Sequence, residues 1–201
     1  MMGARSDDGL TLVEVAVAMV IAVVVMIAAY DELSSASQRI TELERRTTTQ
    51  NEVRLALDAL AKDARQSSTG RADLARVHTA APTELGFYSP DASRPAVHLR
   101  RIEYRVADDT LQRRTTVSVN TVDDPWAGRE TWTWGDPGQW VGVVSDVTAA
   151  TAFSYRDGTG AATTDPHAVQ TIDIHLVVDP NGDRPPGVQT FEMTIDIRGP
   201  S

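Results

Sequence analysis

The chain of 201 residues contains no cysteine. It therefore has neither a disulfide nor a thiolate metal site, and a folded domain in an oxidising compartment must be stable through packing alone. Aromatic residues are also few, at 5% of the chain. A net charge of -9, with 28 acidic residues, disfavours broad binding of nucleic acid, because phosphate contacts dominate such affinity.

Glycine and proline are missing from a long internal stretch. Neither residue occurs between Gly9 and Gly70. Because these two residues are the usual helix breakers, the interval predicts one helix that continues to about Ser67 and is about 80–85 Å long. Polar and β-branched residues weaken the pattern at Thr47–Asn51, where fraying or a local bend is expected.

The first part of this interval is a long apolar run. All sixteen residues from Val15 to Tyr30 are apolar or aromatic, and from Leu10 onward only Thr11 and Glu14 interrupt the run. About 21 residues at a rise of ~1.5 Å span roughly 30 Å, which is enough to cross a bilayer. Placing a carboxylate at the centre of a bilayer costs on the order of 2.5–3.5 kcal/mol, so a partner or a functional role is expected for Glu14.

The residues G-L-T-L-V-E, which run from Gly9 to Glu14, resemble the prepilin processing signal of the type IV pilin and type II secretion pseudopilin superfamily. In that family a prepilin peptidase cuts after the glycine and methylates the new N-terminus. The resemblance implies cleavage between Gly9 and Leu10, N-methylation of Leu10, and Glu14 at the fifth position of the mature chain. The sequence departs from the family pattern in that Leu10 replaces the commoner Phe, and Asp7 and Asp8 make the leader near neutral.

A secretory signal peptide or an ordinary signal anchor would also contain an apolar run of this kind. No small-x-small cleavage site follows the run cleanly, and a plain anchor has no use for Glu14. The resemblance further implies that Glu14 pairs with the N-terminal amine of a neighbouring subunit when helices bundle. In an apolar bundle such a pair would fix axial register, as a single buried polar residue does in a coiled coil.

The second half of the predicted helix is amphipathic. Its apolar residues recur at steps of three and four and comprise Leu33, Ala36, Ile40, Leu43, Leu57, Leu60, Ala61 and Ala64. In the superfamily the outer half of a long helix lies against a β-sheet, which explains this stripe without a second helix. A heptad coiled coil is the alternative.

After Gly70 the pattern changes to short alternating apolar runs separated by turn residues, which predicts a β-rich head. The expected strands are Glu84–Tyr88, Val97–Val106, Thr110–Val119, Thr131–Trp134, Trp140–Val147, Ala152–Tyr155, Val169–Val178 and Val188–Ile197. The last two form the clearest hairpin, because apolar residues alternate on both sides of the turn D-P-N-G-D-R-P-P-G.

Pattern and resemblance together predict an α+β fold of pilin type, in which a long N-terminal helix packs on an antiparallel β-sheet head. The expected divisions are a leader at 1–9, a transmembrane and assembly helix at 10–30, an amphipathic continuation at 31–67 and a β-rich head at 68–201.

One candidate site in the head is a loop with oxygen side chains at alternate positions, Asp179, Asn181 and Asp183. This spacing is similar to the opening of a calcium loop. However, Arg184 stands where that motif has glycine, and Thr190 where it has a closing acidic residue. A simple hairpin turn is therefore favoured over a metal site.

Aromatic and basic clusters are two further candidates. Four tryptophans lie between positions 126 and 140, and Trp132 and Trp134 would share one strand face as a patch for a sugar or a partner protein. A core or interface role is commoner for tryptophan. Several arginines on a predicted hairpin could grip nucleic acid, although acidic residues lie among them and favour cross-strand ion pairing. They are Arg100, Arg101, Arg105, Arg113 and Arg114.

Catalysis and a bound cofactor are not expected. The sequence shows no phosphate-binding loop, nucleophile elbow or cysteine nucleophile. The four histidines also lack metal-ligand spacing; they are His78, His98, His167 and His175.

The sequence is thus interpreted as a minor pilin or pseudopilin, a structural subunit of a type IV pilus or a type II secretion-like filament. The minor role depends on the head size and on the blocks R-I-E-Y-R-V and F-S-Y-R-D-G-T-G, which look like those of minor pilins. The implied partners are the prepilin peptidase, other pilin-like subunits, the inner-membrane assembly platform and, before assembly, membrane lipid; nucleic acid is not an expected partner.

The expected location is a single-pass cell membrane protein with an extracytoplasmic head, which joins a surface or periplasmic filament after assembly. Two alternatives remain open. One is a pilin-anchored binding module, either an adhesin or a DNA-uptake head. The other is a plain single-pass membrane-anchored protein.

Overall fold

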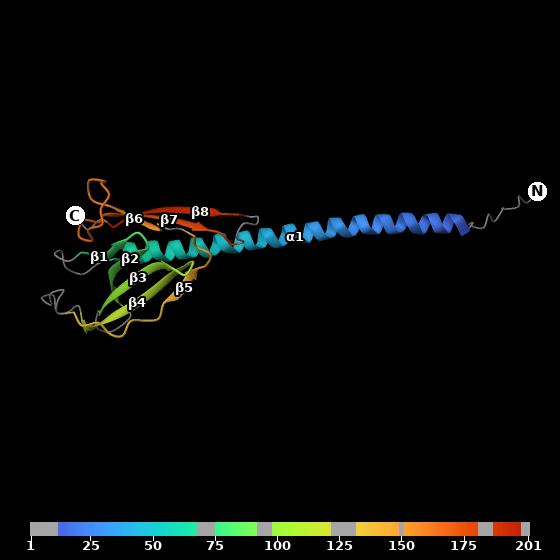
Figure 1. Cartoon of the computed structure of the whole chain (residues 1–201). Coiled ribbons are helices and arrows are strands. Elements are labelled where there is room, and N and C mark those ends of the chain that lie inside the picture. The colour runs from blue at the N-terminus through green and yellow to red at the C-terminus, as the bar shows by residue number, and fades with distance from the viewer. Residues whose placement is uncertain are drawn as a thin grey trace, which may run out of the picture. The chain divides into compact units, whose positions relative to one another are not determined.

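A computed structural model describes residues 12–67, 75–91, 98–121, 132–148, 151–180 and 187–197 (Figure 1). Within these ranges one helix is followed by eight strands in two antiparallel sheets. This confirms the predicted α+β class with a helix packed on sheet. The chain divides into two units, Met1–Arg45 and Arg46–Ser201, and the boundary falls within the helix.

Helix α1 (Leu12–Arg65) is uninterrupted over 54 residues. The expected weak point at Thr47–Asn51 remains helical. The last turn ends with hydrogen bonds from the Gln66 N–H to the Lys62 carbonyl and from the Ser67 N–H to the Ala64 carbonyl, each 3.0 Å. Basic residues in this turn complement the partial negative charge of the helix C-terminus.

Only the last part of α1 packs against the sheets. Its buried residues recur at helical spacing and comprise Val53, Ala56, Leu57, Leu60, Ala61 and Ala64. Of the other residues of the expected stripe, Leu33 is 70% exposed, Ile40 56% and Leu43 63%. These three residues belong to the first of the two units.

The first sheet has the order β1-β2-β3-β4-β5 and the second the order β6-β7-β8, with every neighbouring pair antiparallel. The strands of the first sheet are β1 (Val77–Ala81), β2 (Glu84–Asp91), β3 (His98–Ala107), β4 (Thr110–Thr121) and β5 (Val141–Val144). Those of the second are β6 (Phe153–Arg156), β7 (Thr171–Val178) and β8 (Gln189–Asp196).

The two predicted hairpins are present, since β3 pairs with β4 and β7 with β8. Along β7 the residues alternate between buried and less buried positions, as the sequence pattern requires. The sequence analysis missed β1, in which only Val77 is fully buried, so no alternation marks it.

The strand expected at Thr131–Trp134 is wrong. Of its residues, those that the structure describes form one isolated bridge, between Trp134 and Ser118. Gly135, Pro137 and Gly138 follow directly, and proline cannot donate to a strand ladder. The segment therefore lies along β4 as an irregular edge, held by single hydrogen bonds such as that from the Gly135 N–H to the Val117 carbonyl.

The hydrophobic core is shared by the end of α1 and both sheets. The first sheet contributes Phe87 and Tyr104, for example, and the second contributes Phe153 and Ile172. The Tyr155 hydroxyl joins the two sheets, because it lies 2.6 Å from the Glu84 carbonyl and 3.0 Å from the Ala81 carbonyl. The helix end is thus enclosed by side chains from two directions.

This core predicts how α1 responds to truncation of its side chains. Leu60 is fully buried, so Leu60→Ala should lower the free energy of unfolding by about 2–5 kcal/mol. Leu55, on the same stretch of helix, is 70% exposed. Leu55→Ala should therefore change the free energy of unfolding by no more than about 0.5 kcal/mol. Denaturant unfolding of the full chain in detergent measures both values. Equal losses for the two variants would contradict this assignment of the core.

Candidate functional site

The N-terminal part of α1 is apolar on every side. Each residue from Leu12 to Tyr30 is exposed, and Glu14 is the one charged residue among them. In the described part of the chain α1 is the one helix long and apolar enough to cross a membrane. A helix that is apolar all round belongs in a protein core or a membrane, and among the described residues no other element covers this one. Its surface is compatible with membrane anchoring.

The predicted processing site lies at the start of this segment. Gly9 and Leu10 lie outside the described residues, so cleavage and methylation there remain predictions. Glu14 lies in the first described turn of α1, and its side chain is exposed. The segment thus presents a single carboxylate close to one end of an apolar helix.

Comparison with protein-family models gives a match at this place. Residues 4–30 match the model described as the prokaryotic N-terminal methylation motif. The chain carries the signal of type IV pilins and pseudopilins. The resemblance seen in the sequence is thereby confirmed, and this pilin-type signal implies processing by a prepilin peptidase and assembly with other pilins. Comparison with curated proteins finds no match.

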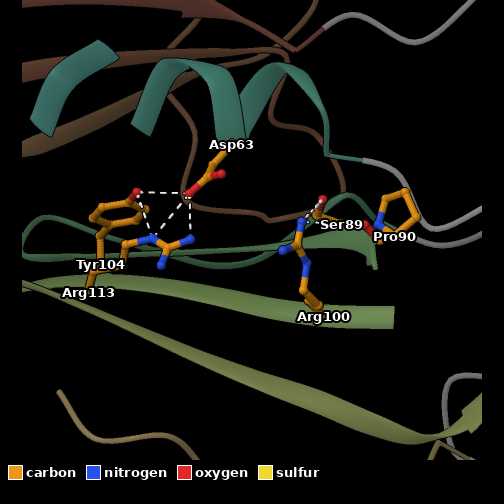
Figure 2. A network of polar contacts seen from close by, with 6 residues as sticks. All are labelled: Asp63, Ser89, Pro90, Arg100, Tyr104 and Arg113. Carbon is orange, nitrogen blue, oxygen red and sulfur yellow. Dashed lines mark hydrogen bonds and ion pairs between the residues drawn. The ribbon is translucent and has the colours of Figure 1, made fainter. Parts of the chain in front are cut away.

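In the head, a polar network joins α1 to the first sheet (Figure 2). Asp63 Oδ2 accepts hydrogen bonds from the Tyr104 hydroxyl (3.1 Å), from Arg113 Nε (3.1 Å) and from Arg113 Nη2 (2.8 Å). Arg113 Nε also donates to the Tyr104 hydroxyl oxygen at 3.1 Å, which closes the triangle. One carboxylate on the helix thus holds two neighbouring strands.

The network is only partly open to water. The side chains of Arg113 and Asp63 are 33% and 16% exposed. Burial raises the pKa of the Tyr104 phenol well above its ordinary value, and the Asp63 carboxylate raises it further. Tyr104 therefore stays neutral and remains a donor to Asp63. The sequence analysis missed this site, although the position of Asp63 beside the buried Leu60 and Ala64 was a usable signal.

The structure brings the tryptophan and arginine clusters together on the other face of the first sheet. The Arg101 guanidinium lies 4.1 Å from the centre of the Trp134 ring. Arg105 and Arg114 lie 4.1 and 4.3 Å from the centre of the Trp140 ring. Contacts of this kind are cation–π interactions, worth about 0.5–2 kcal/mol each. The two clusters, treated as separate candidate sites in the sequence, contact each other.

The aromatic rings of this face also contact one another. Trp134 stacks on Tyr88 at 5.8 Å and on Trp132 at 6.1 Å between ring centres. Trp132 is only 9% exposed and belongs to a small core with Tyr88 and Leu99. Arginine and neighbouring rings thus occupy the faces on which a base or a sugar would stack, which favours a structural role for Trp132 and Trp134.

The five arginines do not form one basic patch, because alternation along the strands divides them between two faces. Arg113 points toward α1, where it binds Asp63. On that same face Arg100 donates long hydrogen bonds, of 3.5 Å, to Ser89 Oγ and the Pro90 carbonyl (Figure 2). Arg114, on the opposite face, pairs with Glu103 at 2.9 Å. This cross-strand pair is the arrangement that the sequence analysis favoured.

The candidate calcium loop, for which the sequence favours a simple hairpin turn, is only partly described. The Asp179 N–H donates to the Asp146 carbonyl at 2.9 Å, whereas Asn181 and Asp183 lie outside the described residues. Among the residues that the structure describes, no group of three or more His, Asp or Glu side chains is placed to hold a metal ion. The hairpin turn that the sequence favours at this loop stays a prediction.

The network at Asp63 predicts measurable coupling between helix and sheet. In a double-mutant cycle of Asp63→Ala and Arg113→Ala, each single change should destabilise the head, because it leaves a half-buried charge without its partner. The coupling should be on the order of 1–2 kcal/mol in urea unfolding of the full chain in detergent.

The exposed pair of Arg156 and Asp173 is the matched control for this cycle. It also has good geometry, at 2.6 Å, but it lies on the surface and should couple more weakly. Equal coupling in the two cycles would contradict a special role for Asp63.

Proposed function

We propose that this chain is a minor pilin or pseudopilin, a structural and non-catalytic subunit of a type IV pilus or a type II secretion-like filament. The observation that carries the proposal is the methylation motif at residues 4–30, in which every described residue of the apolar helix is exposed. The precursor sits in the inner membrane with its head outside the cytoplasm. Lipid covers the apolar segment of α1 in the precursor, and neighbouring subunits cover the same segment in the filament.

Processing follows from the position of the motif. The prepilin peptidase cuts between Gly9 and Leu10 and methylates the Leu10 amine. Removal of the leader leaves a positive amine four residues before Glu14. A free carboxylate in an apolar bundle is costly, whereas a carboxylate paired with the amine of a neighbouring subunit is stabilised and fixes the axial register of the two helices.

The partners of the mature subunit are other pilin-like subunits and the inner-membrane assembly platform. The compact packing of the head supports this role. Its two sheets enclose the end of α1, and its aromatic and basic side chains contact one another. An adhesin or DNA-uptake head receives no comparable support from this face, because the rings that would bind a ligand are already stacked.

The N-terminus of the protein from native membranes tests the processing step. Intact-mass and N-terminal analysis should find a chain that begins at methylated Leu10, and this form should disappear in a peptidase-deficient strain. A chain that begins at Met1 in both strains would identify a plain membrane anchor. Cleavage beyond Tyr30 would identify a signal peptide.

The role of Glu14 is tested by Glu14→Gln, which removes the charge and keeps the size. The variant should insert into the membrane and be cleaved normally, because the peptidase site is intact. Its incorporation into filaments should fall about tenfold or more, since the loss of a desolvated ion pair is worth at least ~1.4 kcal/mol. The ratio of filament to membrane protein measures the effect, and Thr41→Val, a change of similar size farther along α1, is the control. Normal incorporation of Glu14→Gln would contradict the register model.

A further inference from the structure

The exposed stretch of α1 that follows the apolar segment carries a narrow apolar stripe. Leu33, Ala36, Ile40 and Leu43 follow one another at steps of three, four and three residues. The residues between them are Ser, Gln, Arg, Thr and Glu. Leu33, Ile40 and Leu43 are 56–70% exposed, so the apolar side chains of the stripe face outward from the part of the chain that the structure describes.

The width of this stripe distinguishes it from the part of α1 that packs on the sheets. Between Val53 and Ala64 the buried positions come at steps of three, one, three, one and three, which is about three per two turns. Such a wide face fits a sheet or a globular core. Two apolar positions per seven residues, as in Leu33–Leu43, form the seam along which two helices pack side by side.

The charged residues beside this seam, which consists of Leu33, Ala36, Ile40 and Leu43, indicate which kind of helix can pack against it. With Leu33 and Ile40 at the first heptad position, Arg39 and Glu44 occupy the two flanking positions that meet across a parallel pair of helices. In a parallel, in-register pair of identical chains, Arg39 of each copy faces Glu44 of the other, five residues further along. The sequence therefore supplies two complementary contacts to a second copy of itself. Both side chains are exposed and available for them.

The membrane segment makes this arrangement accessible. Two copies anchored by residues 12–30 in one membrane are held parallel, which removes the antiparallel alternative. Anchoring also raises the effective concentration of one seam near another, so a seam too short to associate in solution can pair at the membrane surface.

We propose that residues 33–44 form a parallel, in-register coiled-coil contact with the same segment of a second copy of this chain. This contact rests on the membrane anchoring proposed above but does not require the filament role, because the segment lies outside the methylation motif. It is made by the membrane-held precursor and is already present before processing.

Single cysteines test the contact directly, because the full chain has none of its own. Ala36→Cys and Ile40→Cys lie on the seam, whereas Gln38→Cys lies on the opposite side of the helix. Disulfides form only when two Cα atoms come within about 7 Å, so the seam variants should cross-link and Gln38→Cys should not. Non-reducing electrophoresis of oxidised native membranes reads out the homodimer.

The cross-link is expected both in wild-type and in peptidase-deficient cells. This separates the contact from the filament role, since loss of processing alone should leave the dimer unchanged. Equal cross-linking at all three positions would show random collision and overturn the proposal. The absence of a dimer, or a cross-link to a different pilin-like subunit instead of a second copy, would also overturn it.

A charge reversal tests the orientation. In the Ile40→Cys background, Arg39→Glu places two carboxylates against each other and should reduce the cross-linked dimer about three- to tenfold. Adding Glu44→Arg restores opposite charges and should restore the dimer. Arg45→Glu makes the same change of charge on the outer side of the helix and should have little effect. Failure of the double change to rescue the dimer would exclude the in-register arrangement.

Discussion

The exposed apolar surface of α1 is the constraint on which the rest of the described structure depends. The helix has three successive surfaces. Residues 12–30 are apolar all round, Leu33–Leu43 carry two apolar positions per heptad, and Val53–Ala64 carry three. The width of the apolar surface indicates the environment that can cover it. A surface that is apolar all round suits lipid or a helix bundle, two apolar positions per heptad suit a single helix, and three suit a pair of sheets. One unbroken helix thus presents three different kinds of surface.

The head holds the end of this helix by two kinds of interaction. Burial of Leu60 and its neighbours between two sheets supplies the larger, non-directional part. The Asp63 carboxylate adds direction, because its three hydrogen bonds require Tyr104 and Arg113 at fixed places on adjacent strands. A hydrophobic face alone would tolerate a small rotation of the helix, whereas this triangle would break. The helix end therefore has one defined orientation on the first sheet.

The parts that the sequence predicted correctly are those with a periodic or positional signal. The absence of glycine and proline up to Gly70 predicted α1, and the alternation around Ile172 predicted the last hairpin. The strand at Thr131–Trp134 was wrong because Pro137 and the nearby glycines outweigh the preference of tryptophan for strands. The fate of Leu33 and Ile40 could not be predicted, since periodicity shows that an apolar face exists but not what covers it. The contact of Arg101 with Trp134 depends on folding of segments far apart in the sequence, which no local pattern encodes.

That contact also bears on function. A tryptophan cluster indicates a ligand site only when the faces of its rings remain open. In this head Arg101, Arg105 and Arg114 lie over indole rings, and Trp134 stacks on Tyr88 and on Trp132. A ligand would have to displace contacts that stabilise the edge of the first sheet. The same residues that suggested an adhesin therefore favour a structural head, and among the described residues the longest run of exposed apolar side chains lies on the helix.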